Sequence, residues 1–332
     1  MRFALTEEQQ GFASVLDDLL AASDTAGVGR AWGEGEPAAG LKLWHRLAEL
    51  GLTGLLVPED QGGLGADEVD LVVAFEALGR HAVPGPWLES VSLLPVLLSA
   101  TTEDELLAGI VTGETLATVA LPRLVPYALD ADVATRSFVL DRTLLRRGRP
   151  GDLLRSVDPA RRLFHLEPGP EVVTLDEPVV ERAWDTTALA CAAQLLGAGE
   201  RLLGEAVGYA KQRTQFGRLI GEYQALKHAL ADVRVALDFA RPLVYVAALS
   251  LHAGSSDATR DVSAAKVASG EAAYTAARTA LQVHGAIGYT AEHDLGLWIT
   301  KVRALLTAWG TPAFHRTRVL HAITSDAETV GG

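Results

Sequence analysis

The sequence is poor in sulfur and in positive charge. Its 332 residues include one cysteine, Cys191, and one methionine. A lone cysteine excludes a disulfide framework and every cysteine-based metal cluster, and it is compatible with a reducing compartment. Lysine and arginine number 29 against 42 acidic residues, which leaves a formal net charge of −13. Nucleic acid is therefore not the expected partner, because neutralising phosphates requires clustered basic side chains.

Targeting and membrane signals are also missing. The first ten residues, MRFALTEEQQ, do not combine a basic segment with an apolar core as a signal peptide does. No run of about 18 uncharged apolar residues is present, so we predict no membrane span and a cytoplasmic location. The chain has 48% hydrophobic residues, an ordinary globular fraction, and it is long enough for two or three domains.

Residue patterns divide the chain into three parts. Residues 1–113 are predicted to be helical, beginning at Thr6, whose hydroxyl suits a helix N-cap before two acidic residues. Residues 114–182 have the texture of a small β-rich module. Residues 183–332 return to the helical period, with apolar residues spaced four and three apart over 226–244. We expect an α+β chain, mostly α: an N-terminal helical domain, a small, reduced β middle domain and a C-terminal four-helix bundle.

The strands of the middle domain are predicted from short runs that mix apolar and β-branched residues. These runs are 116–121, 137–140 and 171–175, and proline, glycine and aspartate interrupt the chain between them. The interior, residues 142–171, is rich in arginine, glycine and proline. We therefore expect this interior to be mainly loop.

Common catalytic and metal-binding motifs are not found. The sequence contains no P-loop, no H-E-x-x-H motif and no G-x-S-x-G nucleophile elbow. Glu292, His293 and Asp294 are potential metal ligands, but adjacent residues on one backbone rarely converge on one ion. We predict no metal site and interpret these three residues as a helix cap or a surface salt link.

Three stretches carry a resemblance to a known family. They are ELGLTGLLVPEDQGGLG at Glu49–Gly65, YAKQRTQFGRLIGEYQALKHALADVR at Tyr209–Arg234 and QVHGAIGYTAE at Gln282–Glu292. Each is similar to a signature of the acyl-CoA dehydrogenases, and the three occur in the order and at the separation typical of that family. The length and the helix–β–helix order of the chain agree with the resemblance.

The resemblance implies a flavoprotein that binds FAD and removes hydrogens from Cα and Cβ of an acyl-CoA thioester. In that chemistry a base takes the α-proton and the flavin accepts a hydride from Cβ. Arg213, Gln215 and Phe216 match family residues that contact the adenosine-pyrophosphate portion of FAD. Gln282 and Gly285 match residues that approach the same portion from a neighbouring subunit. An arginine suits an anionic pyrophosphate, and glycine lets backbone come close to it.

The sequence departs from the family at the catalytic base. The two positions at which family members carry a base glutamate correspond here to Trp309 and Thr187. An indole has no lone pair that could accept a proton, and a threonine hydroxyl is a poor base at neutral pH. The flavin-ring elements of the middle domain are also missing, since residues 88–183 contain neither a G-S-D loop nor a tryptophan. No catalytic residue is therefore assigned, and bulky Trp309 is expected to fill part of any cavity.

The retained motifs reach across an interface to the adenosine half of a flavin, whereas the missing ones hold its ring and perform chemistry. The chain thus resembles the short, base-less subunit of actinobacterial-type heteromeric acyl-CoA dehydrogenases. On this hypothesis a longer homologue is the partner, acyl-CoA is the substrate, and FAD is shared at each interface between unlike subunits.

Two alternatives stay open. The first is a self-sufficient enzyme, associating with itself, that uses His293, Glu292 or His315 as an unrecognised base. The second is a flavin-free protein that reuses the fold for binding or for non-redox chemistry, with Trp309 lining a pocket for an apolar ligand.

Overall fold

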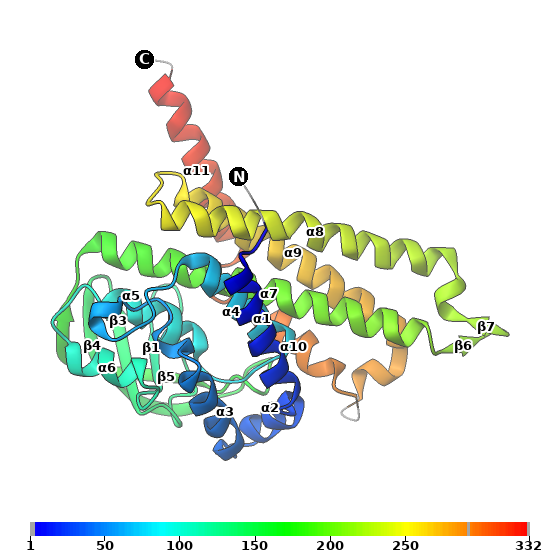
Figure 1. Ribbon diagram of the computed structural model, residues 1–332, viewed down its shortest axis with the longest axis horizontal. Helices are drawn as coiled ribbons and strands as arrows, with labels where there is room; N and C mark the ends of the chain where they lie inside the picture. The colour runs from blue at the N-terminus through cyan, green and yellow to red at the C-terminus, as the bar shows by residue number, and fades with distance from the viewer. Residues whose placement is uncertain (1–3, 291–292, 331–332) are drawn as a thin grey trace.

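The N-terminal part of the protein consists of helices. The computed structural model describes residues 4–290 and 293–330, and within these the helices α1 to α6 precede the first strand (Figure 1). They are α1 (Glu7–Ala21), α2 (Thr25–Gly33), α3 (Ala38–Glu49), α4 (Glu68–Arg80), α5 (Leu94–Leu98) and α6 (Asp104–Val111), with a π-helical segment, η3 (Leu88–Leu93), before α5. The Thr6 hydroxyl accepts the Gln9 N–H and the Gln9 side chain accepts the Thr6 N–H. This capping box confirms the predicted helix start.

Two glycines bring the N-terminal part into contact with the C-terminal helices. Gly79 lies in α4, and Gly197 lies in α7 (Glu177–Ala210). A Cβ on Gly79 would lie 2.0 Å from the Gln194 carbonyl oxygen, and one on Gly197 would lie 1.9 Å from the Glu76 carbonyl oxygen. The two helices therefore touch backbone to backbone, and a larger residue at either position would force them apart.

The middle part is a five-stranded sheet with the strand order β1-β3-β4-β5-β2. The strands are β1 (Ala117–Ala120), β2 (Ala128–Leu129), β3 (Arg136–Asp141), β4 (Leu144–Leu154) and β5 (Leu163–Thr174). β1 pairs with β3 in parallel, and the other neighbours are antiparallel. The three predicted strand runs correspond to β1, β3 and the end of β5.

The prediction that residues 142–171 are mainly loop is wrong. β4 and β5 form a long hairpin through this segment, with register shifts that accommodate Gly148 and Pro150. Most side chains of both strands are exposed or half-buried, so the strands do not show the alternation of a strand with one buried face. Polar cross-strand pairs replace apolar packing there, as between Arg149 and Glu167.

The C-terminal part is a bundle built on three long helices, α7, α8 (Gln224–His252) and α9 (Ala258–His284). Two shorter helices complete it: α10 (Leu295–Thr307) packs on α7 and α9, and α11 (Pro312–Val330) packs on α9. A hairpin, β6 (Thr214–Gln215) and β7 (Arg218–Leu219), joins α7 to α8 through the 3₁₀ turn η4 (Ile220–Glu222), and a second 3₁₀ turn, η5 (Gly285–Tyr289), follows α9. The helix–sheet–bundle order confirms the predicted fold class.

Two details of the bundle concern where α7 begins and how α8 runs. α7 begins at Glu177, before the predicted start of the bundle domain at residue 183. α8 continues through Pro242, and the predicted apolar stripe faces the bundle, with Val233, Leu237 and Val244 buried. Among the described helices α8 is the one long and apolar enough to cross a membrane by length and composition, a test that packed core helices also pass.

Candidate functional site

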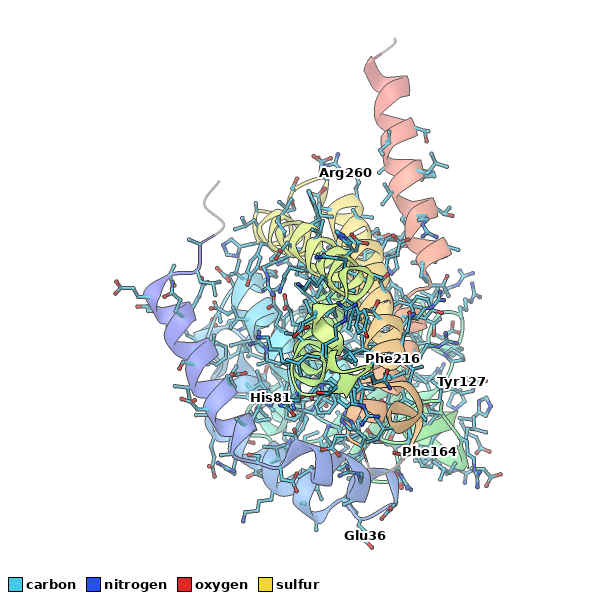
Figure 2. All side chains as sticks on the ribbon, turned by 90° about the vertical axis from the view of Figure 1, so that its right-hand side faces the viewer. Glu36, His81, Tyr127, Phe164, Phe216 and Arg260 are labelled. Atoms are coloured by element: carbon cyan, nitrogen blue, oxygen red, sulfur yellow. The ribbon has the colours of Figure 1, made fainter. Side chains whose placement is uncertain are left out.

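Arg213, Gln215 and Phe216, the first group of residues matched to FAD contacts, lie in or directly before the β6–β7 hairpin. Its turn residues, Phe216 and Gly217, have φ values of +51° and +79°. Positive φ at both central residues matches the right-handed twist of a two-residue hairpin. The turn projects Phe216 from the end of the bundle, with 93% of its surface exposed, and Figure 2 views the molecule from this end.

A groove of about 460 Å³ lies at the base of this hairpin. It is formed by the end of α7, the hairpin, the end of α9 and the η5 turn. Four of the five residues matched to FAD contacts line it together: Arg213, Gln215, Gln282 and Gly285. Phe216 does not line the groove but stands at the hairpin tip. Residues about 70 positions apart in the sequence therefore meet in one site of one chain.

The groove offers an unpaired cation. Within the part of the chain that the structure describes, the exposed Arg213 guanidinium has no hydrogen bond or ion pair. The neighbouring Arg218 instead lies over the Tyr223 ring, 3.9 Å from its centroid. Gly285 adopts φ +63° and ψ −137°, a conformation essentially confined to glycine. A free guanidinium beside a backbone that only glycine can form is suited to an anionic group held close to the main chain.

His284 is a groove residue that the sequence reasoning missed. Its ring stacks on Tyr209 at a centroid distance of 4.4 Å and meets His293 edge-on at 4.9 Å. Nδ1 donates to the Ala280 carbonyl oxygen at 2.8 Å when the ring is neutral, and burial lowers the pKa of His284. Its position between Gln282 and Gly285 in the third motif is the sequence feature that could have identified it as a groove residue.

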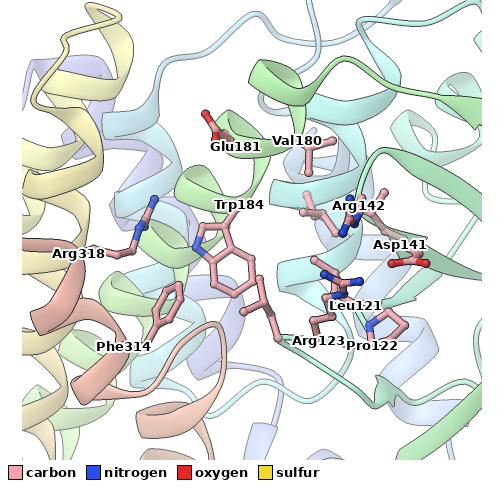
Figure 3. A pocket seen from close by; sticks show the side chains of 13 residues that line it. Leu121, Pro122, Arg123, Asp141, Arg142, Val180, Glu181, Trp184, Phe314 and Arg318 are labelled. Carbon is pink, nitrogen blue, oxygen red and sulfur yellow. The ribbon is translucent and has the colours of Figure 1, made fainter. Parts of the chain in front are cut away.

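A second cavity, of about 360 Å³, lies between the sheet and the bundle (Figure 3). Trp184 of α7 stands at its centre, with Phe314 and Arg318 of α11 on one side and Leu121 and Arg142 on the other. The lining is mainly apolar, with charged side chains around it. This cavity is the chain's own cleft between the middle sheet and the bundle, separate from the groove.

The two family base positions do not face this cleft. Trp309 is 1% exposed, and its ring packs 5.4 Å from that of Trp184. Thr187 is fully buried, and its hydroxyl donates to the Ala183 carbonyl oxygen at 2.7 Å. Neither residue lines the cavity. The idea that Trp309 would line a ligand pocket is therefore wrong for this cavity, which Trp184 lines instead.

The candidate replacement bases are no better placed. His315 is fully buried, and its Nε2 donates to the Trp309 carbonyl oxygen at 2.9 Å while Nδ1 accepts from the Ser263 hydroxyl at 3.2 Å. Burial lowers the pKa of His315 to about 4. His293 lies beside His284 at the groove, where its Nδ1 accepts the Leu295 N–H. Glu292 lies outside the described residues, and Asp294 pairs with Arg30.

Two buried carboxyl groups were not singled out from the sequence. Glu89 of the η3 segment and Asp130 after β2 both have a pKa raised to about 7 by burial, and the nearby charge of Arg161 opposes that rise. One oxygen of each carboxyl group has no hydrogen-bond partner among the described residues. Neither residue lines the cavity, so they are not placed to act on a ligand there.

Comparisons with known proteins find two matching family domains in the chain. The acyl-CoA dehydrogenase N-terminal domain matches residues 6–114, and the acyl-CoA dehydrogenase C-terminal domain matches residues 178–324. The ChsE4–ChsE5 complex from Mycobacterium tuberculosis contains a chain with the same fold, with a TM-score of 0.84 and 23% identity over 98% of this chain and 99% of that one.

Two curated relatives share more of the sequence. Acyl-CoA dehydrogenase IpdE2 of Mycolicibacterium smegmatis is 30% identical over 93% of this chain and 96% of its own length. IpdE2 of Mycobacterium tuberculosis is 34% identical over 78% of this chain and 79% of its own length. The fold is thus that of a flavin-dependent acyl-CoA oxidoreductase. The chain belongs to the acyl-CoA dehydrogenase family, and other proteins of this fold have been solved with FAD bound.

Proposed function

We propose that this chain is the half-site subunit of a heteromeric, FAD-dependent acyl-CoA dehydrogenase. It supplies the site for the adenosine-pyrophosphate half of FAD, and a longer homologue supplies the ring pocket and the catalytic base. One observation supports this proposal most directly. The groove is open and contains the cationic Arg213, whereas Trp309, at the family's base position, is packed into the core.

The groove fits the anionic half of the cofactor. Arg213 presents a planar set of N–H donors that can bind two phosphate oxygens at once. The amides of Gln215 and Gln282 offer donors and acceptors suited to ribose and adenine. Bound FAD would supply the hydride acceptor, and this chain's own residues would orient its pyrophosphate at the subunit surface.

None of the residues considered as the catalytic base lines the chain's own cleft, where the carboxylates are those of Asp141 and Glu181. A general base must come within about 2.6–3.2 Å of the proton that it removes. Trp309 and Thr187 are buried without facing the cavity, and both ring nitrogens of His315 are already engaged. These observations support an acyl-CoA site in the partner rather than in this chain.

The position of the groove supports a shared cofactor. The groove lies at one end of the bundle, and the apolar Phe216 projects beside it almost fully exposed. A partner seated there would cover Phe216 and close the groove around the flavin. The ChsE4–ChsE5 structure, one chain of which has this fold, is a complex of two different proteins. We also propose that the domain limits are 1–113, 114–182 and 183–332 and that the protein is located in the cytoplasm.

The test is co-expression with a longer homologue. The chain purified alone should be colourless and inactive, whereas the co-purified complex should show a flavin spectrum and oxidise an acyl-CoA. Flavin-loaded, active protein from this chain alone would favour the self-sufficient enzyme and contradict the proposal. A co-purified complex without flavin would favour the flavin-free alternative.

A further inference from the structure

The cleft between the middle sheet and the bundle has the size of a ligand site, although the proposed function gives it no role. Its volume of about 360 Å³ lies within the range of roughly 300–1,000 Å³ that small-molecule pockets occupy. It is more than twice the ~150 Å³ of an apolar cavity that binds benzene. Eight of its thirteen lining residues are apolar. The cleft therefore has room for an apolar body larger than one aromatic ring.

The walls of the cleft come from packed elements of the fold. Trp184 on α7 and Phe314 on α11 contribute aromatic rings, whose centroids lie 5.9 Å apart. Leu93 of η3 and Leu140 of β3 are buried and supply aliphatic walls. Because these side chains are already fixed by packing, a ligand would pay little for ordering them. Flat aromatic faces beside aliphatic side chains are suited to an apolar molecule.

Two unpaired cations line one side of this apolar cavity. They are Arg123, which follows β1, and Arg142, which lies between β3 and β4. Neither guanidinium has a hydrogen bond or an ion pair to any residue that the structure describes. Figure 3 shows both on the same side of Trp184, opposite Arg318, whose charge is matched by Asp185 at 2.7 Å. An anionic group on an apolar ligand would therefore meet two free guanidinium groups.

The two carboxylates that line the cleft are arranged differently. Asp141 and Glu181 are exposed and form no ion pair with the described residues. In Figure 3 the Asp141 carboxylate points away from Trp184, and Glu181 lies apart from the two arginines. A cationic ligand would thus meet one carboxylate at a time, whereas an anionic one meets two guanidinium groups. The arrangement favours an anion.

The backbone at Arg142 supports a role for its side chain. Arg142 has φ +53°, and it follows Asp141, which pairs with Leu144 at the end of the β3–β4 hairpin. Glycine, asparagine and aspartate adopt this left-handed conformation most readily in hairpin turns. An arginine offers the turn no such advantage, so it adds strain that asparagine would avoid. Strain of this kind is typical of positions where the side chain binds a ligand.

We propose that the cleft binds a compact apolar carboxylate and holds it without transforming it. The apolar body lies against Trp184 and Phe314, and the carboxylate lies between Arg123 and Arg142. A free carboxylate carries the negative charge that the two arginines recognise, whereas the carbonyl of a thioester is neutral. None of the candidate bases lines the cavity, so the bound molecule is a ligand of this chain and not its substrate.

The first experiment measures binding of matched probes to the purified full-length chain by titration calorimetry. The probes are 1-naphthoate, 1-naphthalenemethanol and 1-naphthylmethylamine, which share one ring system and differ in charge. Naphthoate should bind about 10- to 100-fold more tightly than the alcohol, the ratio expected of hydrogen bonds to a charged group. The amine should bind no better than the alcohol. Equal binding of naphthoate and the alcohol, or tighter binding of the amine, would overturn the proposal.

A fourth probe distinguishes a free acid from a thioester. 1-Naphthoyl-CoA carries the same rings, but its carboxylate is replaced by the neutral thioester. It should compete with naphthoate no better than the alcohol does. If it displaces naphthoate at a lower concentration than naphthoate itself requires, the cleft is an acyl-thioester site and the proposal is wrong.

The second experiment assigns the charge recognition to the two arginines. Arg142→Gln and Arg123→Gln should each weaken naphthoate binding about 10-fold and leave binding of the alcohol unchanged. Arg155→Gln is the matched control, because Arg155 is also exposed and unpaired among the described residues, lies just beyond β4 and does not line the cavity. It should bind naphthoate as wild type does. Equal losses in all three variants, or no loss in Arg142→Gln and Arg123→Gln, would contradict the proposal.

The third experiment separates a binding role of Arg142 from a structural one. Arg142→Asn places a residue suited to positive φ at the turn. It should raise the melting temperature of the chain while weakening naphthoate binding. A lower melting temperature together with unchanged binding would show that the arginine stabilises the turn, and would overturn the proposed role.

The outcome is independent of the cofactor proposal. Arg213→Ala, which alters the groove, should bind naphthoate as wild type does, and Arg142→Gln in the complex with the longer homologue should bind FAD as wild type does. If the complex proved colourless, naphthoate binding by this chain alone would still test the cleft. Loss of naphthoate binding in Arg213→Ala would place the ligand in the groove, contrary to the proposal.

Discussion

The groove at the hairpin and the cleft beside the sheet differ in how their side chains are used. In the groove, the Arg213 guanidinium has no hydrogen bond or ion pair to the residues that the structure describes, and Gly285 holds a conformation reserved for glycine. At the cleft, the Trp184 ring packs against the Phe314 ring and against the buried Trp309, which does not line the cavity. The groove thus presents polar side chains that are free to bind a ligand, whereas the aromatic side chains at the cleft are packed together.

On the proposed function, this difference means that one fold keeps half of a shared site and loses the other half. The groove needs only an exposed hairpin and the end of a helix, and both belong to a stable bundle. The catalytic cleft needs a base held at a precise point, which a single substitution to tryptophan removes. The following experiments probe the two regions in turn, beginning with the largest expected effect.

Replacing Trp309 by glutamate restores the family residue type at the base position but should not create an active chain. The carboxylate would be buried among aromatic rings without reaching the cavity. We expect a loss of about 3–5 kcal/mol in the free energy of unfolding, measured by urea denaturation. Trp309→Phe, which keeps the packing, should lose less. Acyl-CoA oxidation by Trp309→Glu alone would show that the cleft is still organised for catalysis.

His315 should make the protein sensitive to acid. Its pKa is about 4 in the folded state, against about 6.5 when unfolded, because burial disfavours the charged ring. The unfolded state therefore binds the proton first, and stability is lost as the pH falls from 6.5 to 4. The loss from this group is up to about 3 kcal/mol. Thermal melts of wild type and His315→Gln across this range should converge at low pH, and parallel curves would remove His315 as the cause.

Glu89 should have the opposite pH dependence. Burial raises its pKa to about 7 from a usual value of 4.5, so ionising it in the folded state costs free energy as the pH rises from 4.5 to 7. Glu89→Gln should stabilise the protein at pH 8 by roughly 2–3 kcal/mol and have little effect at pH 4. The exposed Glu105 gives the control, because Glu105→Gln should change stability at neither pH.

Arg213→Ala should weaken FAD binding by the co-purified complex about 10- to 100-fold, since a hydrogen bond to a charged group is worth about 1.5–3 kcal/mol. Titration of the apo-complex with FAD, followed by flavin fluorescence, measures the change. The exposed neighbour Lys211 does not line the groove, so Lys211→Ala should bind FAD as wild type does. Equal losses in both variants would mean that general surface charge, rather than the groove, holds the cofactor.

The groove was more predictable from sequence than the cleft. Its residues lie in two short motifs, and the folds of those motifs, a tight hairpin and a helix end, are set locally by Gly217 and Gly285. The aromatic packing at the cleft joins α7, the turn after α10 and α11, and no local sequence pattern predicts such a contact. The β4–β5 hairpin escaped prediction for a related reason. Backbone hydrogen bonds between β4 and β5 stabilise the hairpin, and its exposed side chains do not show the alternation of apolar and polar residues that would have predicted a strand.

The stoichiometry of FAD in the co-purified complex tests the central claim most directly. Flavin absorbance compared with the measured amounts of the two chains gives the number of FAD molecules per pair of unlike chains. A groove without a ring pocket or base in the same chain predicts one FAD per pair and none on this chain alone. Two FAD molecules per pair, or a full complement on this chain alone, would contradict the account.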